Sequence, residues 1–221
     1  MQDAIRDAAT VILSRHGAEG PEVLMGQRGT AAAFMPSKFV FPGGAVDPGD
    51  SGVPLARPLS TTCVQRLAAP GAPEPATLAA TAIRELWEES GLALAEPGGW
   101  PVPAAPDWSA IAGAGLLPSA AGLRFVFRAI TPPGRSRRFD ARFFLVDAGA
   151  VAGDPEDFSR ASDELSHLQW VPLSRARNFD LPFITEVVMA EIALLIDNPS
   201  APDSVPFFDN SGPDPVFRRL A

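Results

Sequence analysis

Short apolar runs separated by Gly- and Pro-rich turns predict most of the strands in this chain. Residues 9–15 (ATVILSR) and 23–28 (VLMGQR) flank a turn-rich HGAEGPE segment, which is typical of a β-hairpin. Further runs that predict strands are residues 38–41, 123–130, 137–148 and 167–173. Because several of these strands follow one another without a helix between them, the pattern favours a mixed sheet over a regular βαβ winding.

The 3.6-residue period of an amphipathic helix occurs in two long stretches. Residues 76–90 give the strongest pattern, and Gly91 follows them where a C-terminal cap is expected. Residues 183–196 (FITEVVMAEIALLI) predict a second helix, and shorter helical pieces are expected at 61–69 and near Trp108. The chain is therefore expected to be an α/β protein in which helices cover a mixed central sheet.

Proline and glycine divide the chain into compact parts and stiff connections. The 221 residues include 24 Pro and 19 Gly, and 46% are apolar, which is enough for one substantial core. Residues at about 51–75 form a Pro- and Gly-rich insertion. From residue 199 the chain is rich in Pro and Asp and is expected to lie along the surface. We therefore predict one domain over residues 1–198 and a Pro-rich C-terminal extension over 199–221.

The charge balance and the absence of long apolar runs restrict the partners. Lys and Arg number 18 against 26 Asp and Glu, a net charge of −8, which argues against binding to nucleic acid or to an anionic membrane. A small phosphorylated ligand is compatible with this charge, because a divalent cation reverses the local sign. No apolar run suits a membrane span, the start MQDAIRDAAT lacks the features of a signal peptide, and the single Cys63 cannot form an internal disulfide. These features predict a cytoplasmic protein.

The candidate chemistry lies near the end of the strongest helix, in the segment RELWEESGL (residues 84–92). At about 100° per residue, Glu85 and Glu89 lie one turn apart, with Glu88 beside them. Like charges at this spacing repel, so the cluster costs stability unless a cation lies over it, and clustered carboxylates suit Mg²⁺ or Mn²⁺. The alternative is a solvated acidic face in which Arg84 pairs with Glu88.

This segment resembles the second half of the Nudix signature, G-x5-E-x7-R-E-U-x-E-E-x-G-U, in which U is apolar. FPGG (residues 41–44) resembles the start of the same signature, and the sixth residue after Gly44 is Asp50, where the signature has Glu. Gly44 and Arg84 lie 40 positions apart where the signature has 14, so about 26 residues are inserted. Asp50 is expected to be the acid that holds Arg84, because it needs no shift of frame, and Glu74 is the alternative.

The resemblance implies a fold and an activity. It implies a Nudix-type α/β/α sandwich with the insertion inside the box, and metal-dependent hydrolysis of a diphosphate linkage in a small-molecule nucleoside diphosphate derivative. The split box and RRFDARFF (residues 137–144) are similar to the branch that includes the peroxisomal coenzyme A diphosphatases, so coenzyme A or acyl-coenzyme A is the expected substrate. An ADP-ribose or NADH-type pyrophosphatase and a weakly catalytic nucleotide-binding module are the alternatives. A homodimer is left open, because homodimers are common for this fold.

The same resemblance implies roles for residues of the helix, of the glycine pair and of a later loop. The expected ligands of Mg²⁺ or Mn²⁺ are Gly44, through its backbone carbonyl, and Glu85, Glu88, Glu89 and Glu164. Arg84 is expected to orient Glu85, and it forms the catalytic set together with the four glutamates. Glu164 lies six residues before Trp170 and is expected to be either a ligand or the general base, with Asp163 as the alternative.

An arginine-rich strand region supplies candidate substrate contacts. Arg137, Arg138 and Arg142 lie in the basic concentration of an otherwise acidic chain, and they are expected to bind phosphates that do not react. The alternative is the solvent-exposed face of a strand. His167 as a base and Cys63 as a nucleophile are less favoured, because a lone His beside a strand is usually structural and Cys63 has no neighbouring His.

Overall fold

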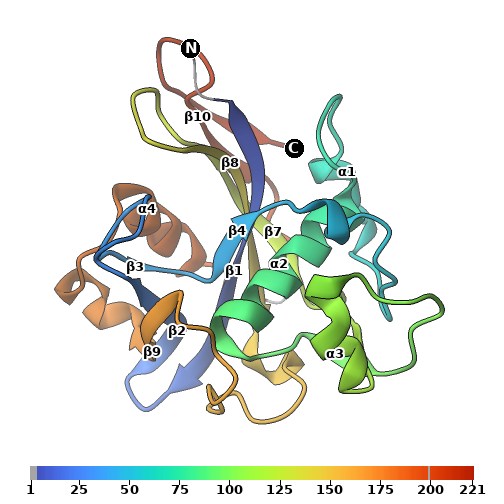
Figure 1. The fold of residues 1–221 in the computed structure, drawn as a ribbon. Helices are drawn as coiled ribbons and strands as arrows, with labels where there is room; N and C mark the ends of the chain where they lie inside the picture. Colours follow the sequence, from blue (N-terminus) through green and yellow to red (C-terminus); the bar gives the residue numbers. More distant parts are fainter. Residues whose placement is uncertain (1–3, 199) are drawn as a thin grey trace.

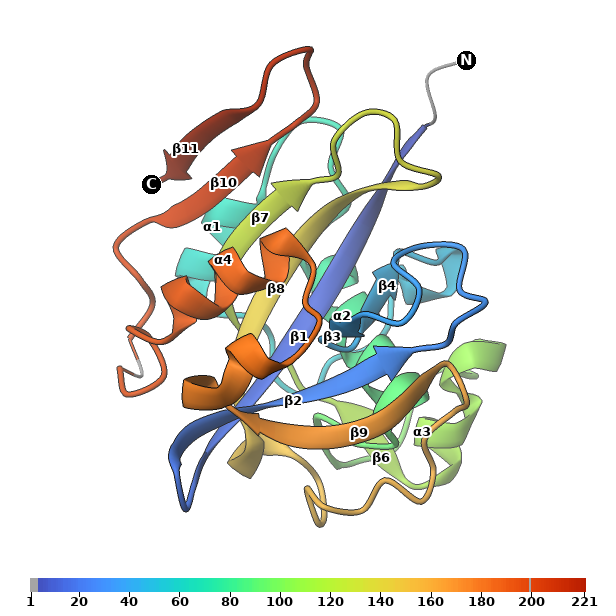
Figure 2. The same ribbon diagram turned by 90° about the vertical axis from the view of Figure 1, so that its left-hand side faces the viewer.

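The computed structural model describes residues 4–198 and 200–221, and it places one large mixed sheet at the centre of the molecule (Figures 1 and 2). Residues 1–3, at the start of the expected domain, and Pro199, where the expected extension begins, lie outside the described residues. The sheet strands are β1 (Ile5–Gly17), β2 (Gly20–Arg28), β3 (Phe39–Val40), β4 (Gly43–Ala45), β7 (Arg124–Ile130), β8 (Arg138–Asp147), β9 (Leu165–Pro172), β10 (Val205–Asp209) and β11 (Val216–Leu220).

The strand order confirms the expected mixed sheet. The main path is β11-β10-β7-β8-β1-β2-β3, with β4 paired to β1 and β9 paired to β2. The pairs β1–β8 and β7–β10 are parallel, and the other pairs are antiparallel, including the predicted β1–β2 hairpin. Two further short strands, β5 (Ala95–Pro97) and β6 (Leu116–Pro118), form a separate pair.

Helices cover both faces of the sheet, which confirms the α/β/α architecture. The helices α1 (Thr61–Leu67), α2 (Pro75–Ser90) and α3 (Ser109–Gly113) lie on one face, and α4 (Phe183–Ile192) lies on the other (Figures 1 and 2). In the part of the chain that the structure describes, no helix is both long and apolar enough to cross a bilayer.

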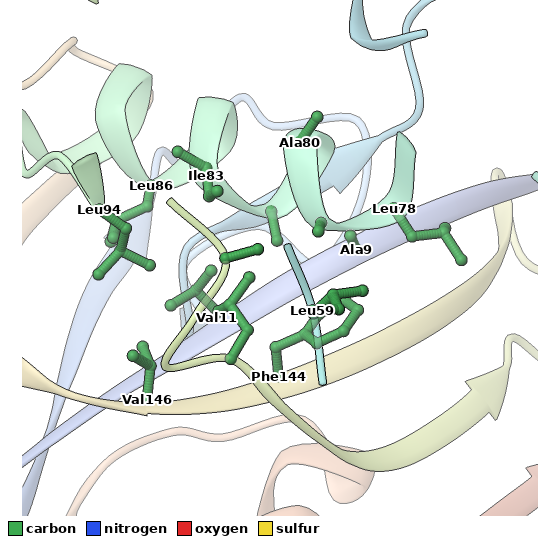
Figure 3. Packing of buried hydrophobic residues seen from close by; sticks show 14 of the residues in the cluster. Ala9, Val11, Leu59, Leu78, Ala80, Ile83, Leu86, Leu94, Phe144 and Val146 are labelled. Atoms are coloured by element: carbon green, nitrogen blue, oxygen red, sulfur yellow. The ribbon is translucent and has the colours of Figure 1, made fainter. Parts of the chain in front are cut away.

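Helix α2 is buried along almost its whole length, which fixes the position of its polar residues. Its apolar side chains, including Ile83 and Leu86, pack against Val11 of β1 and Phe144 of β8 (Figure 3). The helix ends at Gly91, whose φ of 77° is in the left-handed region that favours glycine, as the sequence predicted. Because the packing leaves little freedom to rotate, the carboxylates on α2 are held at defined positions.

The C-terminal residues differ from the sequence expectation. Instead of lying along the surface, β10 and β11 form a hairpin that extends the sheet beside β7. The reason is that Val205 and Phe207 are buried, and the Arg128 guanidinium stacks on the Phe207 ring at 4.4 Å. The insertion supports this hairpin, because Arg66 of α1 donates hydrogen bonds to the carbonyls of Pro202 (2.5 Å) and Asp203 (2.8 Å).

Candidate active site

Two glycines of β4 bring the backbone directly against the carboxylates of α2. The Gly43 N–H donates to Glu89 Oε2 at 2.8 Å. A methyl group at Gly44 would overlap the Glu85 carboxylate, whose Oε2 would lie only 2.6 Å from it. Gly43 is equally confined, because a methyl group there would lie 2.7 Å from the Ala9 carbonyl oxygen of β1. A side chain at Gly43 would thus collide with the backbone of β1, and one at Gly44 would displace the Glu85 carboxylate.

A buried arginine connects the glycine-rich segment to the acidic helix. Arg84 forms a bidentate ion pair with Asp50, with Nε–Oδ1 at 2.8 Å and Nη2–Oδ2 at 3.0 Å. Its Nη1 donates to Glu85 Oε1 and to Glu88 Oε2, both at 2.9 Å. Burial opposes the charge on Arg84, but the bonds to Asp50 and the neighbouring carboxylates raise its pKa. Asp50 is thus the acid that holds the arginine, as expected, whereas Glu74 is exposed at the start of α2.

The pKa values of the three glutamates of α2 are raised to different extents. Burial raises the pKa of Glu85 to about 7, with the charges of Glu88 and Glu164 adding to the shift and Arg84 opposing it. Burial and the Glu85 charge raise the pKa of Glu89 well above its usual range, although the bond from Gly43 opposes this. Glu88 is half-buried, and its pKa is raised mainly by burial. The acid cluster is therefore electrostatically unfavourable when it carries its full negative charge.

These residues fit a hard divalent cation. Glu89 is only 1% exposed, and its Oε1 is buried without a hydrogen-bond partner, which is a costly state for a carboxylate oxygen. Carboxylate and carbonyl oxygens are the donors that Mg²⁺ and Mn²⁺ prefer. Within the described residues no three His, Cys, Asp or Glu side chains already form a metal-binding group. Arg84 holds one oxygen each of Glu85 and Glu88, so a bound ion would use the other oxygen of each.

Glu164 lies beside the cluster at the start of β9. Its side chain is 58% exposed, and its Oε1 is 3.7 Å from Nη1 of Arg28. Its charge contributes to the raised pKa of both Glu85 and Glu89, which places it within electrostatic reach of the two buried acids. The role expected for Glu164, as a metal ligand or the general base, stays a prediction.

A cavity of about 820 Å³ opens next to the glycine pair. Gly43 and Gly44 form part of its wall, and the rest lies between β7, β8, the segment between β2 and β3, and the start of α4. Most of the lining is apolar, and its aromatic members are Phe34, Phe41, Phe139, Phe143, Phe183 and Phe208. The cations in the lining are Arg28, Lys38 and Arg135. The acid cluster thus adjoins a mainly apolar cavity that carries a few positive charges.

The structure corrects two of the three expected substrate arginines. Arg138 is buried and donates to the carbonyls of Thr131 (3.0 Å) and Asn210 (2.7 Å). Arg142 is buried as well and pairs with Asp7 and Asp140. Both guanidinium groups are used inside the protein, because acidic and carbonyl partners from other segments face β8. Arg137 is exposed but lies outside the lining of the cavity.

Sequence reasoning missed Arg28 and Lys38 as cavity residues. Arg28 ends β2 and pairs with Leu165 in β9, which brings it next to Glu164. No local pattern around Arg28 indicates this proximity, because it depends on the pairing of two strands far apart in sequence. Lys38 reaches the cavity at the end of the segment between β2 and β3, and it pairs with Asp180.

The two less favoured catalytic candidates have structural surroundings. Cys63 is buried in the insertion, where its Sγ accepts from the Phe125 N–H at 3.4 Å and lies 3.6 Å from the Leu123 carbonyl oxygen. His167 is exposed, has a φ of 52°, and contacts the Ser166 hydroxyl at 3.1 Å at an irregularity of the β2–β9 pairing. Neither residue lines the cavity.

The raised pKa of Glu85 predicts opposite pH responses for metal binding and for stability. Mn²⁺ affinity is expected to rise by up to about tenfold per pH unit toward pH 7, because a carboxyl group must lose its proton to bind the ion. Protonation of Glu85 stabilises the metal-free fold. This stabilisation is complete below pH 4.5, the ordinary pKa of Glu, and is lost as the pH rises through about 7. Calorimetric Mn²⁺ titrations and thermal unfolding in EDTA between pH 4 and 8 measure the two effects. A Mn²⁺ affinity that does not change with pH would contradict the prediction.

Fold and site together define an α/β protein in which an acidic helix packs under a glycine-rich strand beside a cavity. No family model matches the chain. The crystal structure of a NUDIX hydrolase from Alicyclobacillus acidocaldarius is 32% identical, covers 91% of this chain and 95% of that chain, and superposes with a TM-score of 0.64. The chain therefore belongs to the Nudix hydrolase family.

Two further similarities are weaker, one in sequence and one in fold alone. A putative nudix hydrolase 7 from Caenorhabditis elegans is 30% identical over 179 residues, which cover 75% of this chain. The chain spans only about half (51%) of the length of that relative. A MutT protein from Methanosarcina mazei shares the fold, with a TM-score of 0.51 at 15% identity and coverage of 90% of this chain and 99% of that chain.

Proposed function

We propose that this protein hydrolyses a diphosphate linkage in a nucleoside diphosphate joined to another moiety, with coenzyme A or acyl-coenzyme A as the first candidate substrate. One observation carries the proposal: the buried Glu89 oxygen without a partner, together with Glu85, lies against a glycine pair that forms the wall of the cavity. No acid of α2 lines the cavity, so the proposal requires a diphosphate to meet the acid cluster at the glycine pair that the two share.

The proposed reaction uses Mg²⁺ or Mn²⁺, since Nudix hydrolases generally depend on divalent metals. The residues that would hold the ion are the Gly44 carbonyl, Glu85, Glu88, Glu89 and Glu164. When bound, such an ion neutralises phosphate charge and lowers the pKa of water. Arg84 fixes the directions of Glu85 and Glu88 through its Nη1 atom. Glu164, which is exposed and whose charge acts on Glu85 and Glu89, would accept a proton from the attacking water.

The lining of the cavity supports an extended substrate with both charged and apolar parts. A diphosphate ester needs cations as well as metal, and Arg28, Lys38 and Arg135 are available in the lining. A base or an acyl chain needs apolar surface, which the phenylalanines supply. Among the three cations of the lining, Arg28 is the one that contacts Glu164, and its charge lowers the pKa of Glu89.

A substrate panel tests the proposal directly. The purified protein is incubated with Mg²⁺ or Mn²⁺ and with coenzyme A, an acyl-coenzyme A, ADP-ribose, NADH and dinucleoside polyphosphates, and the products are identified by mass spectrometry. We expect water to cleave the coenzyme A diphosphate into 4′-phosphopantetheine and adenosine 3′,5′-bisphosphate. Cleavage of ADP-ribose or NADH alone would overturn the coenzyme A assignment and keep the chemistry. Tight binding of one compound without any cleavage would favour a nucleotide-binding module.

Arg28 is expected to contribute to substrate binding more than Arg137 does. Replacing Arg28 by Ala removes a charge-assisted contact to phosphate, which is worth about 1.5–3 kcal/mol, so KM should rise by about 10-fold or more. The Arg137→Ala variant is the matched control, because Arg137 is exposed outside the lining. Steady-state kinetics on the best substrate of the panel measures both. A raised KM in the Arg137 variant alone would restore the assignment made from sequence.

A further inference from the structure

The carboxylate of Asp50 accepts more hydrogen bonds than its ion pair with Arg84 supplies. Asp50 is fully buried, and besides the two bonds from Arg84 it accepts from the backbone N–H of Asp47 (3.0 Å) and from the hydroxyl of Thr81 (2.8 Å), both at Oδ2. The Asp47 bond belongs to a capping box of the 3₁₀ helix η1 (Pro48–Asp50). The side chain of Asp50 is thus held from its own loop, from Thr81 and from Arg84.

Two residues of α2 donate to the Asp50 carboxylate, namely Arg84 and Thr81. Thr81 is fully buried, one turn before Arg84, and its hydroxyl also lies 3.0 Å from the Thr77 carbonyl oxygen. A hydroxyl has one proton, and the charged Asp50 oxygen is a stronger acceptor than a carbonyl that already accepts within the helix. The β-branched side chain has few rotamers on a helix, so the direction of this donor is fixed.

We infer that Thr81 is a positioning residue of the active site, which orients the Asp50 carboxylate so that Arg84 presents Nη1 to Glu85 and Glu88. This role in catalysis rests on the proposed function, because the acids that Thr81 helps to arrange are the proposed metal ligands. Without the Thr81 donor, the Asp50 carboxylate can rotate about its last bond, and the bidentate pair with Arg84 loosens. Glu85 and Glu88, which accept hydrogen bonds from Nη1, then lose their fixed orientation.

The inference also explains how this chain uses an aspartate where the Nudix signature has a glutamate. A glutamate at position 50 would be one methylene longer and would extend into the space that the Thr81 hydroxyl occupies, since both residues are fully buried. The shorter acid and the threonine hydroxyl therefore act as one unit. Changing either residue alone should lower Mn²⁺ affinity and kcat. Shortening residue 81 and lengthening residue 50 together should restore part of both.

The first test uses the isosteric Thr81→Val variant and a readout that needs neither metal nor substrate. In ¹⁵N-labelled metal-free protein, the Arg84 Nε–H, which is buried and bonded to Asp50, should give a slowly exchanging NMR signal. In the Val variant this signal should broaden or exchange at least tenfold faster, and Mn²⁺ affinity should fall by about tenfold. Thr81→Ser should keep both within about threefold of the wild type, because it keeps the donor.

Thr77→Val is the matched control, because Thr77 is buried in the same helix and its hydroxyl makes no hydrogen bond to Asp50. A lower unfolding temperature in Thr81→Val, with an unchanged Arg84 signal and unchanged Mn²⁺ affinity, would show a purely structural role and overturn the inference. If the wild type cleaves nothing on the panel, the proposed function fails, but the Arg84 signal still decides the role of Thr81.

The second test is a double-mutant cycle with Asp50→Glu and Thr81→Ala. Each single change should lower Mn²⁺ affinity and kcat by about tenfold, and the double variant should recover at least half of the loss on a logarithmic scale. Losses that simply add in the double variant would overturn the coupling between the two residues. If one of the single variants does not fold, recovery of a folded double variant supports the coupling, and failure of the double variant contradicts it.

Discussion

Replacing Glu89 by Gln is expected to lower kcat on the best substrate of the panel by about 10³-fold while making the metal-free protein more stable at pH 8. Loss of one charged metal ligand, the role proposed for Glu89, removes several kcal/mol of transition-state stabilisation. The gain in stability follows from burial, because Glu89 is 1% exposed, faces the charge of Glu85 and has an oxygen without a partner. A neutral amide keeps an acceptor for the Gly43 N–H and removes the repulsion.

Steady-state kinetics and thermal unfolding in EDTA measure the two opposite effects. The difference in unfolding temperature should shrink as the pH falls toward the ordinary pKa of Glu, because the raised pKa of Glu89 favours the protonated carboxyl, which resembles the amide. Glu186→Gln, an exposed change on α4, serves as the control and should alter neither quantity. Full activity in the Glu89 variant would show that the acid cluster on α2 is not the centre of the reaction.

The sequence predicted the acidic helix well because its constraints are local. The period of α2, the cap at Gly91 and the spacing of the acids all lie within one short segment, and the structure shows each of them. The partner of Arg84 was predictable despite the insertion, because Asp50 lies six residues after Gly44, where the Nudix signature has its acid. Local spacing thus sufficed to find the part of the site that lies on one helix and its adjoining strand.

The remaining features depend on strands that meet only in the folded protein. The pattern of Arg138 and Arg142 on a strand suggested exposed phosphate contacts, but Asp7, from β1, is among the groups that neutralise Arg142 in the interior. Arg28 reaches Glu164 because β2 pairs with β9. The C-terminal hairpin was hidden by its Pro- and Asp-rich flanks, although the apolar residues of β10 pack into the core. Such features follow from tertiary pairing, which a single sequence does not specify.

Replacing Asp50 by Asn is expected to destabilise the metal-free protein by about 3 kcal/mol, which is the second large effect. Breaking a buried ion pair leaves a buried charge without full compensation and costs about 3–5 kcal/mol. The lower end applies here because Glu85 and Glu88 still neutralise Arg84. In addition, an amide nitrogen would replace one of the two oxygens that accept from Arg84, Thr81 and Asp47, so at least one buried donor would lose its acceptor.

Urea unfolding in EDTA at pH 7 measures this loss as a shift of the midpoint at constant slope. Glu74→Gln is the matched control, because Glu74 is the other acid near the start of the helix, is exposed and makes no capping hydrogen bond, so its change should cost less than about 0.5 kcal/mol. Equal losses of unfolding free energy in the two variants would contradict a stabilising role of the Asp50–Arg84 pair. Arg84 would then be held mainly by the Ala45 carbonyl (3.1 Å) and by the acids that it orients, so the Asn variant should also bind Mn²⁺ more weakly than the wild type.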